Sequence, residues 1–72
     1  MPIVEITSPA FPQESKDRIA KAITKLLAEE EKAAIKIDTT PITVIIFREI
    51  AVPDLYVGAK PLAKVLETLP KA

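Results

Sequence analysis

The hydrophobic pattern at the start of the chain predicts a β-strand. Residues 3–7 read Ile-Val-Glu-Ile-Thr and are mostly β-branched, which favours extended backbone. Pro9 and Pro12 follow closely, and neither has the N–H group that a sheet ladder needs. The strand should therefore end near residue 7, and residues 8–12 should form a connector.

A helix is predicted next, because apolar residues recur at the spacing i, i+4, i+7 and i+8. Pro12 suits the first position of this helix, where a missing N–H group is no loss. Charged residues occupy the other faces and indicate a solvated surface. No glycine marks the end of the helix, so the pattern does not predict at which residue after 33–34 the helix ends. The residues of the predicted buried stripe are Ile19, Ile23, Leu26 and Leu27.

A second strand is predicted over residues 42–49, which are apolar on both faces for most of their length. This pattern is typical of a strand that is covered on both sides. The order strand, helix, strand predicts a βαβ unit with two parallel strands and a right-handed crossover. One helix covers only one face of such a sheet, so partner subunits should cover the other.

The rest of the chain predicts a small hairpin and a short helix, which makes the fold class α+β. Pro53 indicates a turn, and residues 55–59 form a short extended or hairpin element. Gly58 is the only glycine, and we expect it where the backbone needs positive φ or a close approach. Pro61 can start the last helix, which is too short to be stable unless it docks on a neighbouring subunit. Its apolar stripe is Leu62, Val65, Leu66 and Leu69.

Composition limits the number of domains and the kinds of site that the chain can contain. The 72 residues are enough for one small domain, residues 1–72, and contain no cysteine and no histidine. Disulfides, zinc fingers and thiol nucleophiles are thereby excluded, and we expect no metal and no cofactor. Such a short chain buries only about 60% of its unfolded surface. Because 49% of its residues are apolar, we expect a homo-oligomer.

The charge pattern argues against nucleic acid as a partner, and the lengths of the apolar runs argue against a membrane. Ten basic and ten acidic residues are interleaved, which does not favour binding to nucleic acid. No apolar run reaches the 18 residues of a membrane span, and the start has no signal-peptide pattern. We therefore expect no membrane partner and a cytoplasmic location.

Several stretches occur here in an order that resembles the 4-oxalocrotonate tautomerase family of short-chain tautomerases. They are the opening Met-Pro-Ile-Val-Glu-Ile, the helix start Gln-Glu-Ser-Lys at 13–16, Thr-Val-Ile-Ile at 43–46, and Tyr-Val-Gly-Ala-Lys at 56–60. The resemblance covers most of the chain except the region around residues 30–41. It implies a β-α-β protomer that dimerises into a four-stranded sheet, with three dimers forming a hexamer.

The resemblance also implies a catalytic base. Pro2 becomes the amino terminus once Met1 is removed, and its ring nitrogen moves a proton between carbons of a small enol or dienol carbonyl acid. An α-amino group ordinarily has a pKa of about 7.7–8.0, and burial or a nearby cation lowers it. A base with a pKa near ambient pH is the effective kind. If Met1 stays, Pro2 nitrogen is a tertiary amide and is not basic.

The arginines that hold substrate in this family are absent from their usual positions. This chain has phenylalanine and proline at positions 11 and 12, and Thr43 stands where the second arginine is common. Thr43 is a candidate substrate-binding residue or simply a strand residue. Arg48 is a further candidate, but it lies five residues on and should project from the opposite face of the strand. We expect it to pair with a neighbouring acid such as Glu49 or Asp54.

The hairpin also departs from the family pattern. Leu55 stands where an aromatic residue is common, Tyr56 follows it, and Ala59 replaces a second glycine. Leu55 and Tyr56 are candidates to line the substrate pocket, although interface packing is the favoured role for Tyr56. We expect Lys36 and Lys60 to be solvated, and the alternative is that each acts as a substitute cation from a neighbouring subunit.

Two hypotheses of different class follow. The first is a tautomerase, an isomerase that acts on small carbonyl acids with Pro2 as general base. The second is a non-catalytic assembly subunit that keeps the tautomerase fold and pairs with a related chain, which supplies the missing cations.

Overall fold

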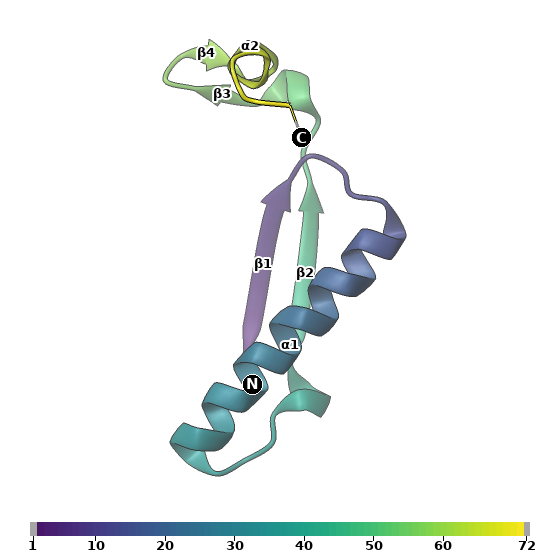
Figure 1. The fold of residues 1–72 in the computed structure, drawn as a ribbon, viewed down its shortest axis with the longest axis vertical. Helices are drawn as coiled ribbons and strands as arrows, with labels where there is room; N and C mark the ends of the chain where they lie inside the picture. Colours follow the sequence, from purple (N-terminus) through teal and green to yellow (C-terminus); the bar gives the residue numbers. More distant parts are fainter. Residues whose placement is uncertain (1, 72) are drawn as a thin grey trace.

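The computed structural model describes residues 2–71, which form an α+β fold. Strand β1 (Ile3–Ser8) and strand β2 (Val44–Glu49) run parallel, and helix α1 (Gln13–Ile35) connects them and lies across one face of the pair (Figure 1). The ladder pairs Ile3 with Val44 and continues without a break to Ser8 opposite Glu49. The predicted βαβ unit is thereby confirmed.

Helix α1 ends without a glycine, which is why its end could not be predicted from the sequence. Lys36 takes the left-handed conformation at φ 62° and donates its backbone N–H to Lys32 O at 3.0 Å. This conformation normally favours glycine, and here a lysine adopts it. A 3₁₀ turn, η1 (Thr40–Ile42), then precedes β2, so the strand begins two residues later than predicted. At the other end, Pro12 is the N-cap residue and α1 begins at Gln13.

The stripe that α1 presents to the sheet differs in part from the prediction. Ile19, Ile23 and Leu27 are half-buried as expected, but Leu26 is 60% exposed. Ala28 is the helix residue that is buried instead. The stripe of α1 that faces the sheet therefore consists of Ile19, Ile23, Leu27 and Ala28, and Leu26 lies outside it.

The two faces of the sheet are distinguished by their contacts with α1. On the covered face, Lys16 of α1 pairs with Glu49 at 2.6 Å, and Phe11 meets Phe47 edge to face with ring centroids 6.3 Å apart. Successive strand residues alternate between faces, and paired residues share one. The opposite face, which we call the open face, therefore carries the remaining strand residues. These are Ile3, Glu5, Thr7, Val44, Ile46 and Arg48.

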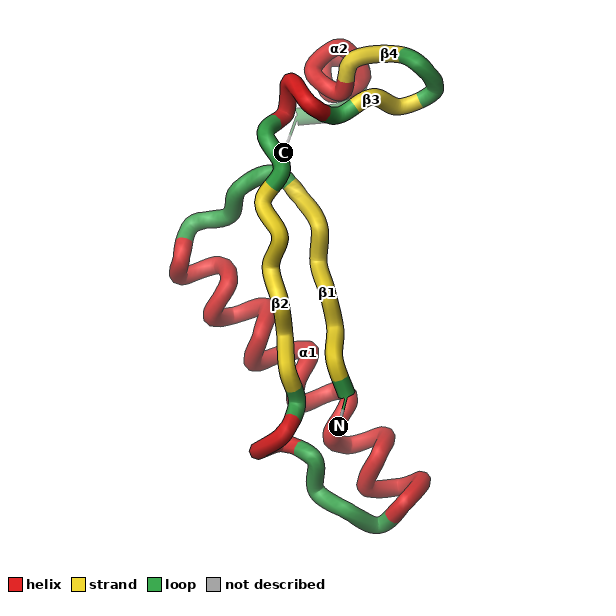
Figure 2. The backbone as a smooth tube through the Cα atoms, turned by 180° about the vertical axis from the view of Figure 1, so that it is seen from behind, coloured by secondary structure: helices red, strands yellow, loops and turns green. Residues whose placement is uncertain are grey.

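The last part of the chain forms a separate unit, which we call the C-terminal arm (residues 52–69). It contains a 3₁₀ turn η2 (Val52–Asp54), an antiparallel hairpin of β3 (Tyr56–Val57) and β4 (Lys60–Pro61), and helix α2 (Leu62–Glu67). The arm extends beyond the carboxyl ends of β1 and β2 and packs chiefly on itself (Figures 1 and 2). The predicted hairpin and short helix are confirmed.

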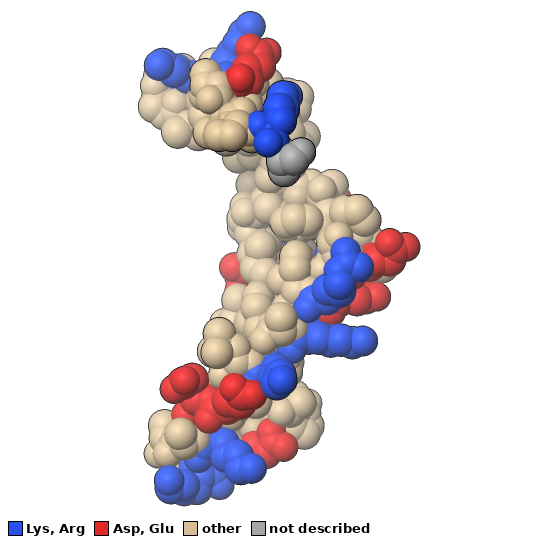
Figure 3. Space-filling model, in the orientation of Figure 1, with Lys and Arg blue, Asp and Glu red and all other residues tan. Residues whose placement is uncertain are grey.

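A single chain has almost no interior. Among residues 2–71, only Ala28 and Thr39 are buried. The radius of gyration is 16.0 Å, whereas a compact domain of this length has about 11 Å. The molecule measures 46 × 25 × 21 Å, and its space-filling view is elongated, with charges gathered over α1 and the arm (Figure 3). The other hydrophobic residues of this described part are therefore half-buried or exposed.

The turn between β3 and β4 gives a first prediction. Gly58 and Ala59 both have positive φ, at 56° and 66°, as a two-residue type I′ turn requires. Gly58 confirms the expectation from sequence, but Ala59 is strained there because of its Cβ. We expect Ala59→Gly to raise the free energy of unfolding by about 0.5–1 kcal/mol, measured by urea denaturation at fixed protein concentration.

The matched control is Ala51→Gly, because Ala51 has an ordinary extended conformation with φ −65°. There glycine only adds freedom to the unfolded chain, so stability should fall by about 0.5–1 kcal/mol. Equal losses in the two variants would contradict the strained turn.

Candidate functional site

Pro2 is half-buried and directly precedes β1. Its carbonyl oxygen accepts the backbone N–H of Val44 at 2.9 Å, so the residue is tied to β2 by the first hydrogen bond of the ladder. Chain ends normally fray unless such a bond holds them. The predicted removal of Met1 lies outside the described residues.

Thr43 directly precedes Val44 in the chain and therefore lies beside Pro2. Its hydroxyl donates to the backbone carbonyl of Thr39 at 2.8 Å. The hydroxyl proton is thus engaged with the main chain, and the Thr43 oxygen is left to accept a hydrogen bond. Of the five residues singled out from sequence, Pro2 and Thr43 are distant in the chain and are brought side by side by the fold, whereas Leu55 and Tyr56 are sequence neighbours.

Arg48 projects from the open face, as the odd spacing from Thr43 predicts. Its guanidinium binds Glu5 twice, with Nη2–Oε1 at 3.2 Å and Nε–Oε2 at 3.3 Å. The expected pairing with Glu49 or Asp54 is wrong, because Glu5 lies nearer on the same face and Glu49 is held by Lys16 on the other. The hydrogen bond with Glu5 raises the pKa of Arg48 above its usual value. Arg48 is also about 16 Å along the strand from Thr43.

Leu55 and Tyr56 lie in the C-terminal arm, beyond the carboxyl end of β2. Leu55 is half-buried, and its carbonyl accepts the N–H of Leu62 at 2.9 Å, which joins the hairpin to α2. Tyr56 is 65% exposed. Pro2 is at the opposite end of the sheet, so a single chain does not assemble the five residues into one site.

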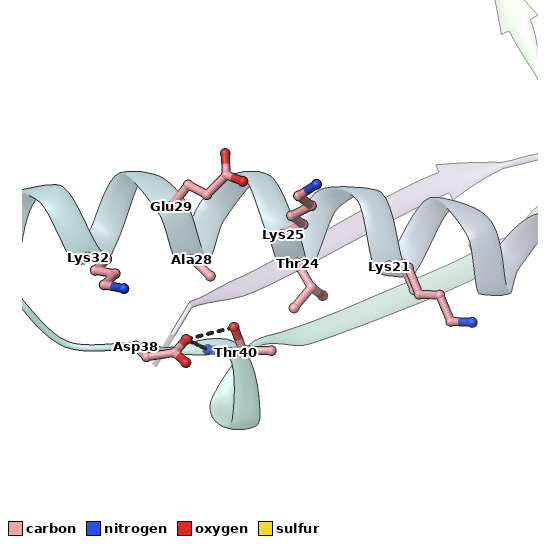
Figure 4. A pocket seen from close by; sticks show the side chains of 9 residues that line it. Lys21, Thr24, Lys25, Ala28, Glu29, Lys32, Asp38 and Thr40 are labelled. Carbon is pink, nitrogen blue, oxygen red and sulfur yellow. Dashed lines mark hydrogen bonds between the residues drawn. The ribbon is translucent and has the colours of Figure 1, made fainter.

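A groove that the sequence did not predict lies between α1 and residues 38–40, with a volume of about 490 Å³ (Figure 4). Small side chains one turn apart on α1 leave it hollow, and lysines stand along it. None of the five predicted residues lines it. The small residues are Ala20, Thr24 and Ala28, and the lysines are Lys21, Lys25 and Lys32. The spacing i, i+4, i+8 of small residues is the signal in the sequence that marks this groove.

At one side of the groove Asp38 forms a local hydrogen-bonded turn with Thr40 (Figure 4). Its Oδ1 accepts the Thr40 hydroxyl at 2.7 Å and the Thr40 backbone N–H at 3.0 Å. The hydroxyl bond first, and then the backbone bond, hold the pKa of Asp38 below its usual value. A lowered pKa makes the Asp38 carboxylate a weaker base than an ordinary aspartate.

Two kinds of feature are not found within residues 2–71. No group of three or more His, Cys, Asp and Glu side chains in this described part is placed to hold a metal ion. Over the same residues, none of the helices has both the length and the apolar character needed to cross a membrane.

Comparison with known proteins adds no relative. The chain matches no protein-family model, no curated protein and no solved structure. The architecture is therefore the observation that can be compared with the family resemblance. The βαβ start with parallel strands, followed by an antiparallel hairpin, is compatible with a tautomerase protomer.

The Asp38 turn gives a second prediction. Because the pKa of Asp38 is lowered in the folded chain, its contacts with Thr40 contribute stability above the unfolded pKa. That stability is lost as pH falls through the folded pKa. Thr40→Ala removes the hydroxyl bond, so we expect the Asp38 pKa to move up toward its ordinary value in an NMR titration of the carboxyl carbon.

Thr40→Ser keeps both hydrogen bonds and serves as the control, with an Asp38 titration like that of the parent. The stability difference between parent and Thr40→Ala should shrink as pH falls below the folded pKa. A difference that stays constant down to low pH would show that the Thr40 contacts act without the Asp38 charge.

Proposed function

We propose that this protein is a tautomerase, an isomerase that moves a proton between carbons of a small enol or dienol carbonyl acid. The base is the ring nitrogen of Pro2, exposed by removal of Met1. The observation that supports this most is the hydrogen bond from Val44 N–H to Pro2 O at 2.9 Å. It fixes the first residue of the processed chain to a sheet, and a base must be held in place to act.

The surroundings of Pro2 suit such a base. Pro2 is half-buried and is tied to β2 through its carbonyl oxygen, so the position of its ring is set by the sheet. Thr43 beside it offers a hydroxyl oxygen rather than a positive charge. In this proposal Thr43 contacts the substrate, and the group that steadies the enolate oxygen comes from elsewhere.

The site is completed between copies of the chain in this proposal. Leu55 and Tyr56 lie at the far end of the same protomer, so they reach a Pro2 only in another copy. A homo-hexamer built as a trimer of dimers, with a four-stranded sheet in each dimer, is the assembly that the family resemblance implies. The near absence of buried residues in one chain supports an assembly of this kind.

The preferred substrate follows from the charges. Arg48 is neutralised by Glu5 and faces away from Pro2, so it does not supply a free cation beside the base. A substrate with two carboxylates needs more positive charge than this chain places there. We therefore propose enols with one carboxylate or none.

The lack of a free cation beside Pro2 favours the second candidate function, a non-catalytic subunit that pairs with a related chain. In that case the related chain brings the cations to the Pro2 side of the sheet. The two functions separate on whether the chain alone is active.

The third prediction tests the base. Protein whose free Pro2 is verified by mass spectrometry should catalyse keto–enol exchange of phenylpyruvate enol, with kcat/KM rising as pH rises through the pKa of the amine, because the neutral amine is the base. Pro2→Ala should lower kcat/KM about 100-fold, the contribution of a positioned base. Protein that retains Met1 should be inactive, since its Pro2 nitrogen is an amide.

Pro9→Ala is the matched control, because it removes a proline from the connector and leaves the amino terminus intact. Its activity should equal that of the parent. Activity that survives in the Met1-retaining form would refute Pro2 as the base. Absence of activity at every pH, with the free proline verified, would favour the assembly subunit.

A further inference from the structure

The groove along α1 is a second candidate site, separate from Pro2. Helix α1 forms one side of it and residues 38–40 form the other (Figure 4). Its volume of about 490 Å³ lies within the range of small-molecule sites, which is roughly 300–1,000 Å³. Pro2 does not line it, so a ligand held here would leave the proposed base unoccupied.

The floor of the groove is apolar. Ala20, Thr24 and Ala28 follow one another at steps of four residues, so they lie on one face of α1 and extend about 12 Å along its axis. Ala28 is buried, and Ala20 and Thr24 are half-buried. Because all three side chains are small and end in methyl groups, a narrow alkyl chain can lie along this floor.

The charges along the groove favour an anion. Three lysines line it against two acids, Glu29 and Asp38, so the lining has a net charge of +1 although the whole chain has none. The ion pairs found within residues 2–71 are those of Lys16 and Arg48, and neither involves a lysine of the groove. The ammonium groups of the groove are therefore available to an anionic partner.

The two ends of the groove differ in charge. At one end Lys32 lies over Asp38, and the two opposite charges interact (Figure 4). Lys21 stands at the other end (Figure 4). The acid one turn before it, Asp17, accepts a hydrogen bond from Gln13 Nε2 at 3.1 Å. Positive charge is thus less compensated at the Lys21 end.

We infer that the groove binds an anionic amphiphile, a molecule with an alkyl chain and one anionic head, such as a medium-chain carboxylate. The chain lies on the floor of small side chains, where its apolar surface is removed from water. The head pairs with Lys21 at the less compensated end. This site belongs to a single chain and does not depend on the proposed function.

The experiment uses decanoate as the probe, kept below the concentration at which it forms micelles, and follows the parent protein by NMR. We expect saturable shifts of the Ala20, Thr24 and Ala28 methyl signals, with one molecule bound per chain and weaker binding as salt is added. Acetate has the head without the chain, and decyltrimethylammonium has the chain with a cationic head. Both should bind at least about tenfold more weakly.

Two variants with matched controls test the floor and the head. Thr24→Leu puts a larger side chain on the floor and should abolish saturable binding, whereas Ala22→Leu, at an exposed position of α1 outside the groove, should not change it. Lys21→Gln should weaken binding about two- to fivefold, as the loss of one exposed ion pair does. Lys64→Gln, in α2, should have no effect.

Several results would overturn this site. They are equal binding of decanoate and decyltrimethylammonium, parent-like affinity in the Thr24→Leu chain, and shifts confined to the sheet or the C-terminal arm. Groove signals that change when the protein is diluted without ligand would also overturn it, because a second copy would then occupy the groove. Pro2→Ala should bind decanoate as the parent does, and loss of binding there would place the ligand at the proposed base. An active tautomerase that does not bind decanoate would disprove this site alone.

Discussion

The parallel ladder between β1 and β2 is the interaction on which the other features of the chain depend. Its first hydrogen bond, from Val44 N–H to Pro2 O, holds the start of the described chain in the sheet. Its register decides which residues face α1 and which face the open side. The same register brings Arg48 level with Thr7 and within reach of Glu5. A shift of one residue would exchange the two faces and separate these partners.

The elements of the fold were largely predictable because each has a local signal. The β-branched residues of the first strand, the helical spacing of Ile19 and Ile23, and the apolar second strand were sufficient to predict a βαβ unit. Gly58 indicated the hairpin, since its positive φ is a requirement of a tight turn. The face of Arg48 followed from an odd count of residues along a strand.

What the sequence did not predict depends on contacts between distant residues or on rare backbone states. Arg48 pairs with Glu5, which is 43 residues away, while acids close in sequence were the expected partners. The end of α1 relies on a lysine in a conformation that usually needs glycine. The exposure of Leu26 and the groove along α1 result from how the helix lies on the sheet, which the helical period alone does not determine. The candidate site was harder to predict from the sequence than the fold, because its residues lie at both ends of the protomer.

If the homo-oligomer that we propose forms, the scarcity of buried residues within one chain has a consequence for how the protein is made. When the surfaces that must leave water belong to different copies, folding becomes a second-order event whose yield depends on how many chains are present. Dilution then acts as a denaturant, and newly synthesised chains stay exposed to proteases until they meet. The cellular abundance of this small protein would thus set not only how much of it there is, but what fraction of it is folded.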